Sequence, residues 1–278
     1  MQSFHNSQIT DNAIIGYPLS HSLSPVLHAF VYEKYGLSAR MEKLEEKNIE
    51  RAMQAIRKKP YALIAVTIPH KVEILKYLDE ISETARDIGA VNTVINMGGV
   101  LKGYNTDITG LEYALGDIQI QDKAVLLLGA GGAARPAAYW AKQKGLNILC
   151  ANRSQKGAEN LVQKFGGGLV SIGQVDPERI GLIINATPIG MYPKSDLSPL
   201  PSEFFRPHHS IFDMVYSPLE TILLKKARAA GARTISGLNM FVAQGLEQIR
   251  LWSGFDTLSY GSQAFEYLRC MLIQPARE

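Results

Sequence analysis

KAVLLLGAGGAAR, residues 123–135, is the most informative segment of the chain, because it joins an apolar run to a glycine-rich turn and then to a helical pattern. The turn has the order Gly129-x-Gly131-x-x-Ala134. In dinucleotide-binding units of the Rossmann type, the first glycine permits a sharp bend and the second lets the backbone approach a pyrophosphate, while a small third residue lets helix and strand pack closely. Backbone N–H groups at the helix N-terminus then face the anion. We therefore predict a cofactor-binding turn; a tight structural turn without a ligand is the alternative.

The end of the next apolar run indicates which dinucleotide would bind. NAD-binding units usually carry an acid about 20 residues after the turn, for the ribose 2′-OH, whereas NADP-binding units place an arginine nearby. Residues 150–154 read Cys-Ala-Asn-Arg-Ser, with no acid. Arg153 can pair with a 2′-phosphate, Ser154 can donate a hydroxyl and Lys156 adds charge. We predict NADP rather than NAD; alternatively, Arg153 is a solvated loop residue and Ser154 an ordinary helix N-cap.

Strands and helices alternate on both sides of this turn. Upstream, apolar runs at 13–16, 61–66 and 90–96 alternate with helical patterns at 25–35 and near 71–78. This alternation predicts an α/β sheet with mainly parallel strands. Downstream, a helix to about residue 144 and another at 155–165 separate strands, which are expected at 146–152, 181–187, 210–216 and 232–236. The sequence thus predicts two α/β units, joined at 105–111 by a helix that begins near Asp107.

Two further patterns lie in the second half of the chain. Residues 239–252 and 258–272 both have apolar residues at intervals of three and four, which is typical of amphipathic helices. The pattern does not show on which unit they pack. Residues 191–203 are rich in turn residues, and we expect a surface loop there.

Composition excludes several classes of protein. The 278 residues are 46% hydrophobic and 20% charged, and the 29 basic and 26 acidic residues are spread along the chain, so no basic stripe indicates nucleic-acid binding. The two cysteines, Cys150 and Cys270, lie in no CxxC or Cys/His cluster, which argues against a disulfide framework and a zinc site. No apolar stretch reaches the ~18 residues of a membrane span, and the first twelve residues are polar. We expect a cytoplasmic protein with no metal, nucleic-acid or membrane partner.

An anion site is indicated at residues 22–25, Ser-Leu-Ser-Pro. Ser24 is placed as an N-cap and Pro25 at the first helical position. Ordinary capping accounts for these two residues but leaves Ser22 unexplained. The hydroxyls of Ser22 and Ser24, beside free N–H groups of a helix N-terminus, would hold a carboxylate.

Polar side chains also follow several apolar segments. The strand that ends at Val66 is followed by Thr67 and Lys71, and Asn92 and Asp107 come at the ends of later segments. Ligands of open α/β sheets usually bind at the carboxyl ends of the strands. Taken singly, Lys71 could be a solvated lysine in a first helical turn, and Asp107 could stabilise the helix that follows it.

Nine motifs, in this order, link these segments along almost the whole chain. They are SLSP (22–25), VTIPHK (66–71), GAVNT (89–93), NTD (105–107), GAGGAAR (129–135), NRS (152–154), NATPIGM (185–191), DMVY (213–216) and GLNMFVAQ (237–244). In this combination the chain resembles the shikimate dehydrogenase family. The resemblance implies reversible, NADP-dependent reduction of 3-dehydroshikimate to shikimate, in the shikimate pathway of aromatic amino-acid biosynthesis.

The resemblance also implies roles for individual residues. Lys71 and Asp107 match the catalytic pair. The residues that match substrate contacts are Ser22 and Ser24, with Tyr216, on the carboxylate, and Thr67, Lys71, Asn92, Asp107 and Gln244 on the ring. Those that match cofactor contacts are Glu83, Gly129, Ala130, Gly131, Gly132, Ala133, Asn152, Arg153, Ser154, Met214 and Gly237. The implied domains are a substrate-binding domain at 1–106, to which 239–278 returns, and a Rossmann-type NADP-binding domain at 107–238.

Three departures from the family pattern keep alternatives open. Ala65 stands where asparagine is usual, Ala29 follows His28 where asparagine is usual, and Gly157 replaces a second basic residue. Ala65 keeps quinate or aminoshikimate open as the substrate, and Gly157 weakens the preference for NADP over NAD. A non-catalytic NADP-dependent regulator is the alternative from another class. We expect a small-molecule substrate and a monomer or homodimer.

Overall fold

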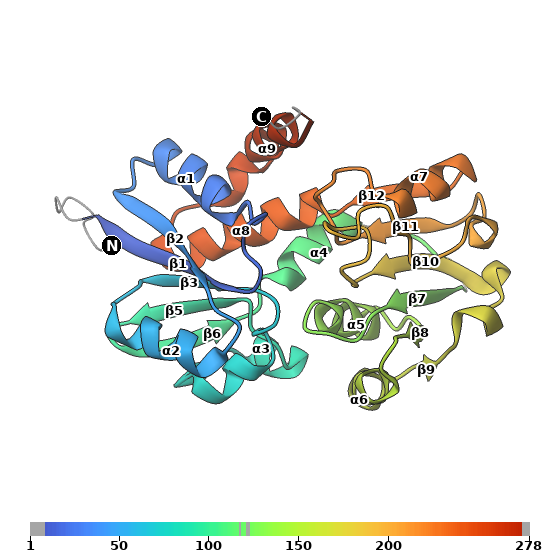
Figure 1. Cartoon of the computed structure of the whole chain (residues 1–278), viewed down its shortest axis with the longest axis horizontal. Helices are drawn as coiled ribbons and strands as arrows, with labels where there is room; N and C mark the ends of the chain where they lie inside the picture. Colours follow the sequence, from blue (N-terminus) through green and yellow to red (C-terminus); the bar gives the residue numbers. More distant parts are fainter. Residues whose placement is uncertain (1–8, 117, 121–122, 274–278) are drawn as a thin grey trace. The chain divides into compact units, whose positions relative to one another are not determined.

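Two compact units, each with its own six-stranded sheet, make up the computed structural model, which describes residues 9–116, 118–120 and 123–273 (Figure 1). Unit 1 contains Met1–Thr109 and Val242–Leu268, and unit 2 contains Gly110–Phe241 and Arg269–Glu278. The divisions fall inside three helices, α4 (Asp107–Leu115), α8 (Leu238–Ser253) and α9 (Gly261–Ile273). Of the twelve residues of the polar N-terminal segment, 1–8 lie outside the described residues.

The sheet of unit 1 is mixed, with the strand order β2-β1-β3-β5-β6-β4. Its strands are β1 (Thr10–Gly16), β2 (Ala39–Glu45), β3 (Leu63–Val66), β4 (Glu80–Ile81), β5 (Thr93–Met97) and β6 (Val100–Tyr104). β1 runs parallel to β2 and β3, whereas β5 runs antiparallel to both β3 and β6. The strands of this sheet are therefore mainly parallel, as expected, and β5 is the exception.

A two-residue hairpin turn explains this change of direction. Gly98 and Gly99, between β5 and β6, have φ angles of +66° and +101°. Such angles suit the tight hairpin turns whose twist matches that of the strands, and a Gly-Gly pair between apolar runs is a known sequence signal for them. A hairpin joins antiparallel neighbours, so the chain needs no crossover helix here.

The helices of unit 1 are α1 (Ser24–Lys34), α2 (Ile49–Lys58) and α3 (Glu83–Ile88), with a 3-10 turn, η1 (Glu73–Tyr77), where a helix near 71–78 was expected. The core between helices and sheet includes Ile15, Ile64, Val91 and Val94.

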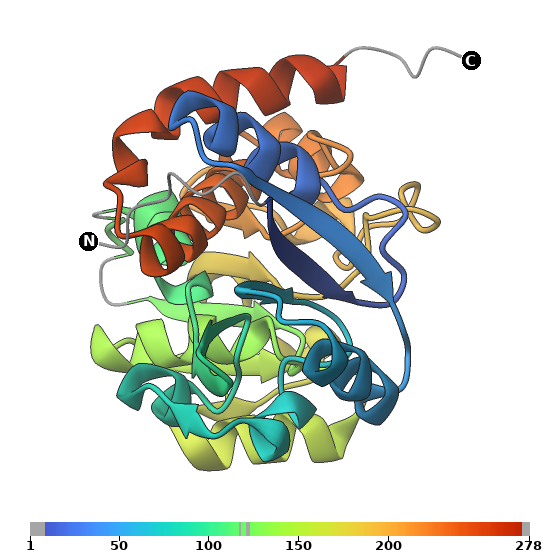
Figure 2. The same cartoon turned by 90° about the vertical axis from the view of Figure 1, so that its left-hand side faces the viewer.

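Most of α8, from Val242, and α9 as far as Leu268 belong to unit 1. Gln248 of α8 contacts His28 of α1, at 3.2 Å between side-chain atoms. Tyr267 of α9 (Gly261–Ile273) stacks on Phe30 of α1, with 4.7 Å between ring centroids. Figure 2 shows these two red helices beside the blue helix α1.

The sheet of unit 2 is fully parallel, with the strand order β12-β11-β10-β7-β8-β9. The strands are β7 (Ala124–Leu128), β8 (Ile148–Ala151), β9 (Gly168–Leu169), β10 (Ile180–Asn185), β11 (Ser210–Asp213) and β12 (Arg233–Ser236). The helices between them are α5 (Ala134–Gln143), α6 (Gln155–Phe165) and α7 (Ile222–Ala229). The strand order reverses between β7 and β10, which is the kind of switch point at which doubly wound sheets bind dinucleotides.

The proline-rich segment 191–203 forms turns and, at its end, the start of a 3-10 turn, η4 (Ser202–Phe204). Its turn residues were correctly interpreted, but Leu200 and Phe204 are buried in the core of unit 2. In the part of the chain that the structure describes, no helix has the length and apolar character needed to span a membrane.

Candidate functional site

Lys71 and Asp107 form a largely buried ion pair in unit 1. The ammonium of Lys71 donates to Asp107 Oδ2 at 2.6 Å, and the two side chains are only 13% and 5% exposed. Lys71 lies in the turn after β3, and Asp107 is the first residue of α4. The alternative of a solvated lysine is therefore wrong. Removing one partner of a buried pair leaves an uncompensated charge, so these two groups depend on each other.

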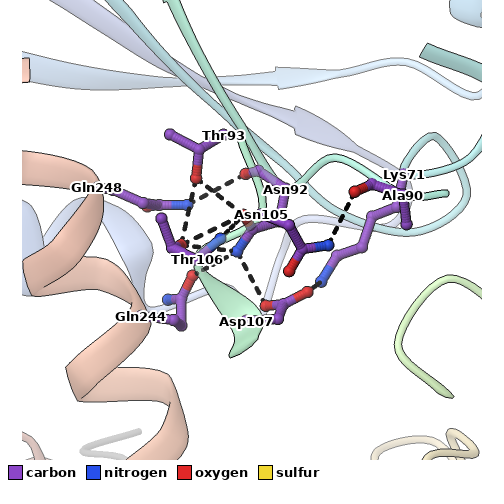
Figure 3. Close-up of polar contacts among 9 residues, drawn as sticks. All are labelled: Lys71, Ala90, Asn92, Thr93, Asn105, Thr106, Asp107, Gln244 and Gln248. Carbon is purple, nitrogen blue, oxygen red and sulfur yellow. Dashed lines mark hydrogen bonds and ion pairs between the residues drawn. The ribbon is translucent and has the colours of Figure 1, made fainter. Parts of the chain in front are cut away.

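Asn92 connects this pair to a cluster of polar side chains (Figure 3). Its Nδ2 lies 2.9 Å from Asp107 Oδ1, 2.9 Å from Thr106 Oγ1 and 3.1 Å from Gln244 Oε1. Its Oδ1 accepts from the Thr106 backbone N–H at 2.7 Å and from the Thr93 hydroxyl at 2.9 Å. A primary amide has two hydrogens, so Asn92 cannot donate to all three acceptors at once. The cluster presents amide, hydroxyl and carboxylate groups, the kinds of group that bind a polyhydroxylated ligand.

Asn105 contributes another buried acceptor beside the ion pair. Its Nδ2 donates to the Ala90 carbonyl oxygen at 2.8 Å, which fixes the orientation of the amide. Its Oδ1 is buried and has no hydrogen-bond partner within the described residues. In Figure 3 the Asn105 amide and the Lys71 amine lie on the same side of the cluster.

A series of buried hydrogen bonds connects the cluster to α8, α1 and β1. Gln248 of α8 donates to the Asn92 carbonyl oxygen at 3.1 Å, and its Oε1 lies 3.2 Å from His28 Nε2. His28 Nδ1 lies 3.0 Å from the Tyr32 hydroxyl, which accepts from Asn12 Nδ2 at 2.7 Å. Because Gln248 Oε1 can only accept, the His28 proton lies on Nε2. Burial lowers the pKa of His28 to about 4, which keeps the ring neutral.

The serine and threonine candidates lie on neighbouring strand ends in unit 1. Ser22 and Ser24 follow β1 and Thr67 follows β3, which is the parallel neighbour of β1. The expected N-cap role of Ser24 is wrong. Ser24 is the first residue of α1, Leu23 occupies the cap without a side-chain bond, and the Ser24 N–H points to Ser22 Oγ at 3.4 Å. Ser22, rather than Ser24, therefore supplies the hydroxyl that faces an N–H group at the start of α1, although the 3.4 Å distance is long for a hydrogen bond.

In unit 2, the glycine turn has the geometry that a dinucleotide requires. Gly129 has a φ of +107°, and a Cβ there would lie 3.1 Å from the Ala186 carbonyl oxygen. A Cβ on Gly131 would meet nothing within 4 Å, so its backbone faces open space. The cap of α5, at Ala133, has no side-chain hydrogen bond, so no side chain occupies the first N–H groups of this helix. Gly129, Ala130, Gly131, Gly132 and Ala133 therefore fit a pyrophosphate.

Arg153 is exposed in the turn after β8, as a residue that binds a phosphate group needs to be. Ser154 caps α6, and its Oγ accepts from the Gly157 N–H at 3.4 Å. Its own hydroxyl hydrogen can still be donated to a ligand. Asn152 folds back onto the Ser154 carbonyl oxygen at 2.9 Å, and a Cβ on Gly157 would lie 3.2 Å from Asn152 Nδ2.

The remaining candidates are divided between the units. Met214 and Gly237 lie at the carboxyl ends of β11 and β12, where a Cβ on Gly237 would lie only 2.4 Å from the Met214 carbonyl oxygen. Tyr216 is also in unit 2 and stacks on Phe241 at 4.3 Å. Glu83 belongs to unit 1 and is the first residue of α3, where an acidic side chain also stabilises the helix N-terminus.

The structure therefore brings Lys71, Asn92, Asp107 and Gln244 into one cluster and the glycine turn and strand-end residues into another unit. Sequence reasoning assigned no role to His28, Asn105, Asp213 or Gln248. His28, Asn105 and Asp213 lie within or beside motifs quoted above. All three are polar side chains that are buried, and burial is visible only in the structure.

Comparison with known proteins points to the shikimate dehydrogenase family. A family model described as the shikimate dehydrogenase substrate binding domain matches residues 14–94. The shikimate dehydrogenase (NADP(+)) of Methanocaldococcus jannaschii is 40% identical over 87% of this chain and 91% of its own length. The crystal structure of shikimate 5-dehydrogenase from Thermus thermophilus in complex with NADP(H) and shikimate is 35% identical, with a TM-score of 0.82 over 93% of this chain and 99% of that one. Quinate dehydrogenase from Corynebacterium glutamicum, in complex with NAD, is 26% identical, with a TM-score of 0.82 over 93% of this chain and 99% of that one.

Proposed function

The chain belongs to the shikimate dehydrogenase family, and we propose that it catalyses the reversible, NADP-dependent reduction of 3-dehydroshikimate to shikimate. This reaction belongs to the shikimate pathway of aromatic amino-acid biosynthesis. The observation that carries the proposal is the buried Lys71–Asp107 pair within the polar cluster of Asn92 and Gln244. An exposed pair without such neighbours could neither shield a reacting carbonyl from water nor recognise several hydroxyls.

Lys71 handles the proton. NADP, when bound, supplies or accepts the hydride. In the reducing direction the Lys71 ammonium donates its proton to the oxygen that becomes an alkoxide, and in oxidation the amine takes the proton back. Asp107 holds Lys71 Nζ at 2.6 Å and so fixes the position of the donor.

The other side chains of unit 1 orient the substrate ring. Thr67, Asn92, Asp107 and Gln244 hold the ring hydroxyls, while Ser22 and Ser24 hold the carboxylate. The resemblance assigns the carboxylate to Tyr216 of unit 2 as well. Hydrogen bonds of this kind discriminate strongly, because an analogue that lacks a hydroxyl leaves a buried polar group unpaired. The fixed network around Asn92 supports this role, since its amide is held on both its oxygen and its nitrogen.

The cofactor is held by unit 2 in this proposal. Gly129 to Ala133 bind the pyrophosphate, and Asn152, Arg153 and Ser154 bind the 2′-phosphate end. Met214 and Gly237 contact the nicotinamide end, and Glu83 of unit 1 adds a further contact. The open face of Gly131 and the exposed guanidinium of Arg153 support the assignment.

Quinate is the second candidate substrate, because Ala65 replaces the usual asparagine. Ala65 is buried and packs with Ile14 and Leu19, so this position offers no polar group to a ligand. Aminoshikimate remains a further alternative on the same scaffold. The monomeric or homodimeric state and the cytoplasmic location remain predictions from the sequence.

A two-by-two assay tests the proposal. Reduction of NADP and of NAD is followed spectrophotometrically with shikimate and with quinate. We expect the highest kcat/KM for shikimate with NADP. A higher kcat/KM for quinate would contradict the substrate assignment, and tight NADPH binding without turnover of either acid would instead favour the non-catalytic regulator.

A further inference from the structure

Asp213 is a buried carboxyl group that the proposed mechanism does not use. It is the last residue of β11 and has no exposed surface. Its Oδ1 accepts from Asn185 Nδ2 at 2.9 Å and from the Val215 N–H at 3.1 Å, and its Oδ2 accepts from the Thr221 hydroxyl at 2.7 Å. Burial raises the pKa of Asp213 to about 6. Burying a carboxyl group costs free energy unless it is hydrogen-bonded, and the three hydrogen bonds of Asp213 join separate segments of the chain.

Asn185 links Asp213 to the loop that follows β10. Asn185 Oδ1 accepts from the Thr187 N–H at 3.1 Å and from the Thr187 hydroxyl at 2.7 Å. The Ile189 N–H points to Thr187 Oγ1 at 3.2 Å, and Asn185 Nδ2 also points to the Ile189 carbonyl oxygen at 3.2 Å. One network therefore joins residues 186–189, after β10, to residues 214–215, after β11.

These two segments lie at the edge of the sheet where the second half of a dinucleotide binds. β10 and β11 are on the far side of the switch point from β8, whose end carries Arg153. Each half of a doubly wound sheet takes one mononucleotide, so an adenosine 2′-phosphate at Arg153 leaves the nicotinamide for the ends of β10 to β12. The segments also touch cofactor candidates directly: Ala186 lies against Gly129, and Met214 lies against Gly237.

We propose that Asp213 is a positioning residue for the nicotinamide half of the cofactor, because it ties the segments after β10 and β11 into one fixed arrangement. The inference rests on the proposed function, since it needs NADP at this sheet edge. Asp213 does not touch the cofactor in this proposal; it acts through the backbone of Met214 and the loop at Ala186. The adenosine half, held by the glycine turn and Arg153, does not depend on it.

Asp213→Leu removes both acceptor oxygens and with them all three hydrogen bonds. We compare binding of NADPH, followed by its fluorescence, with binding of adenosine 2′,5′-bisphosphate, which represents only the adenosine half. We expect the Kd of NADPH to rise at least about tenfold, which corresponds to about 1.4 kcal/mol, and the Kd of the fragment to stay within about twofold. Asp213→Asn, in contrast, should bind NADPH nearly as tightly as the unaltered protein. Its Oδ1 can accept from Asn185 Nδ2 and the Val215 N–H, and the Thr221 hydroxyl oxygen can accept from its Nδ2.

A matched control lies at the other end of the same strand. His209 directly precedes β11 and is fully buried, with contacts to the Arg206 N–H and the Pro177 carbonyl oxygen at 3.2 and 2.9 Å. His209→Gln should lower thermal stability without changing the ratio of the two dissociation constants. If Asp213→Leu does not fold, Thr187→Val, which removes one hydroxyl of the network, should raise the same ratio to a smaller extent.

An unchanged ratio in the folded variants overturns the proposal, and so does a parallel loss of NADPH and fragment binding, which would mean general damage to unit 2. Failure of the unaltered protein to bind NADPH at all would refute the proposed function instead. The two failures are therefore distinguishable.

Discussion

At the level of single residues, the proposed chemistry depends on Lys71 and Asp107, whose side chains are only 13% and 5% exposed. Lys71 and Asp107 were ambiguous one at a time, and their motifs made the pairing predictable before any distance was known. The 2.6 Å contact and the low exposure of both side chains agree with that prediction. His28 could not be assigned in the same way, since its partner Gln248 lies 220 residues away in the chain.

Lys71→Ala should lower kcat/KM for shikimate with NADP by much more than about tenfold, because it removes the proton donor and leaves Asp107 unpaired. Steady-state kinetics measure this change. Lys76→Ala is the matched control, since Lys76 lies in the neighbouring turn with a side chain that is 71% exposed. Turnover within about tenfold of the unaltered enzyme, a loss of no more than ~1.4 kcal/mol, would show that Lys71 is not the proton donor.

Arg153→Gln should change the choice of cofactor. Charge-assisted hydrogen bonds contribute about 1.5–3 kcal/mol, so we expect the KM for NADP to rise about 10- to 100-fold. The KM for NAD, which has no 2′-phosphate, should stay nearly constant. Arg179→Gln, which also changes an exposed arginine of unit 2, controls for net charge. Equal effects on both cofactors would contradict the assignment.

At the level of helices and strands, apolar periodicity predicted the buried strands and the edge strand β12, but it missed β2, β4, β6 and β9. β3 and β7 are wholly apolar and were expected, and so was the apolar half of β1 at 13–16. β2, with the sequence ARMEKLE, lies at the sheet edge and is half exposed, so its composition resembles that of a loop. The Gly98-Gly99 signal was present in the sequence and would have predicted the β5–β6 hairpin.

The link between α1 and α8 predicts an acid sensitivity of unit 1. The pKa of His28 is about 4 in the folded protein and about 6.5 in an unfolded chain, so the unfolded chain binds more protons between these values. The contribution of His28 to stability is therefore complete above about pH 6.5 and falls as the pH drops toward 4. Between pH 7 and pH 5 the loss should be about 2 kcal/mol.

Urea unfolding can isolate this effect, because the chain has two tryptophans, one in each unit. In a Trp140→Phe background, the fluorescence of Trp252 reports on unit 1, where Trp252 packs against Tyr32. His28→Gln should be less stable at pH 7 and should lose much less stability between pH 7 and pH 5. The same pH dependence in both proteins would rule out His28 as its source.

At the level of the whole molecule, two α/β units and the return of the C-terminal helices followed from the alternation of patterns and from the family resemblance. The boundaries were less predictable for a physical reason. All three divisions fall inside helices, α4, α8 and α9, whose patterns continue across the boundary. A periodic helix gives no local signal of the residue at which its contacts pass from one core to another.

The division of labour between the units predicts which amides each ligand protects from hydrogen exchange. A ligand present at about 100 times its Kd stabilises the structure that binds it by about 2.7 kcal/mol. Shikimate alone should therefore slow exchange around Lys71, Asn92 and α8 in unit 1, while NADPH alone should slow exchange around Gly129 and the ends of β10 and β11 in unit 2. Lys71→Ala provides the control for shikimate, and Arg153→Gln for NADPH. If either ligand protected only the opposite unit, the assignment of substrate to unit 1 and cofactor to unit 2 would be wrong, because protection must begin where the binding free energy is applied.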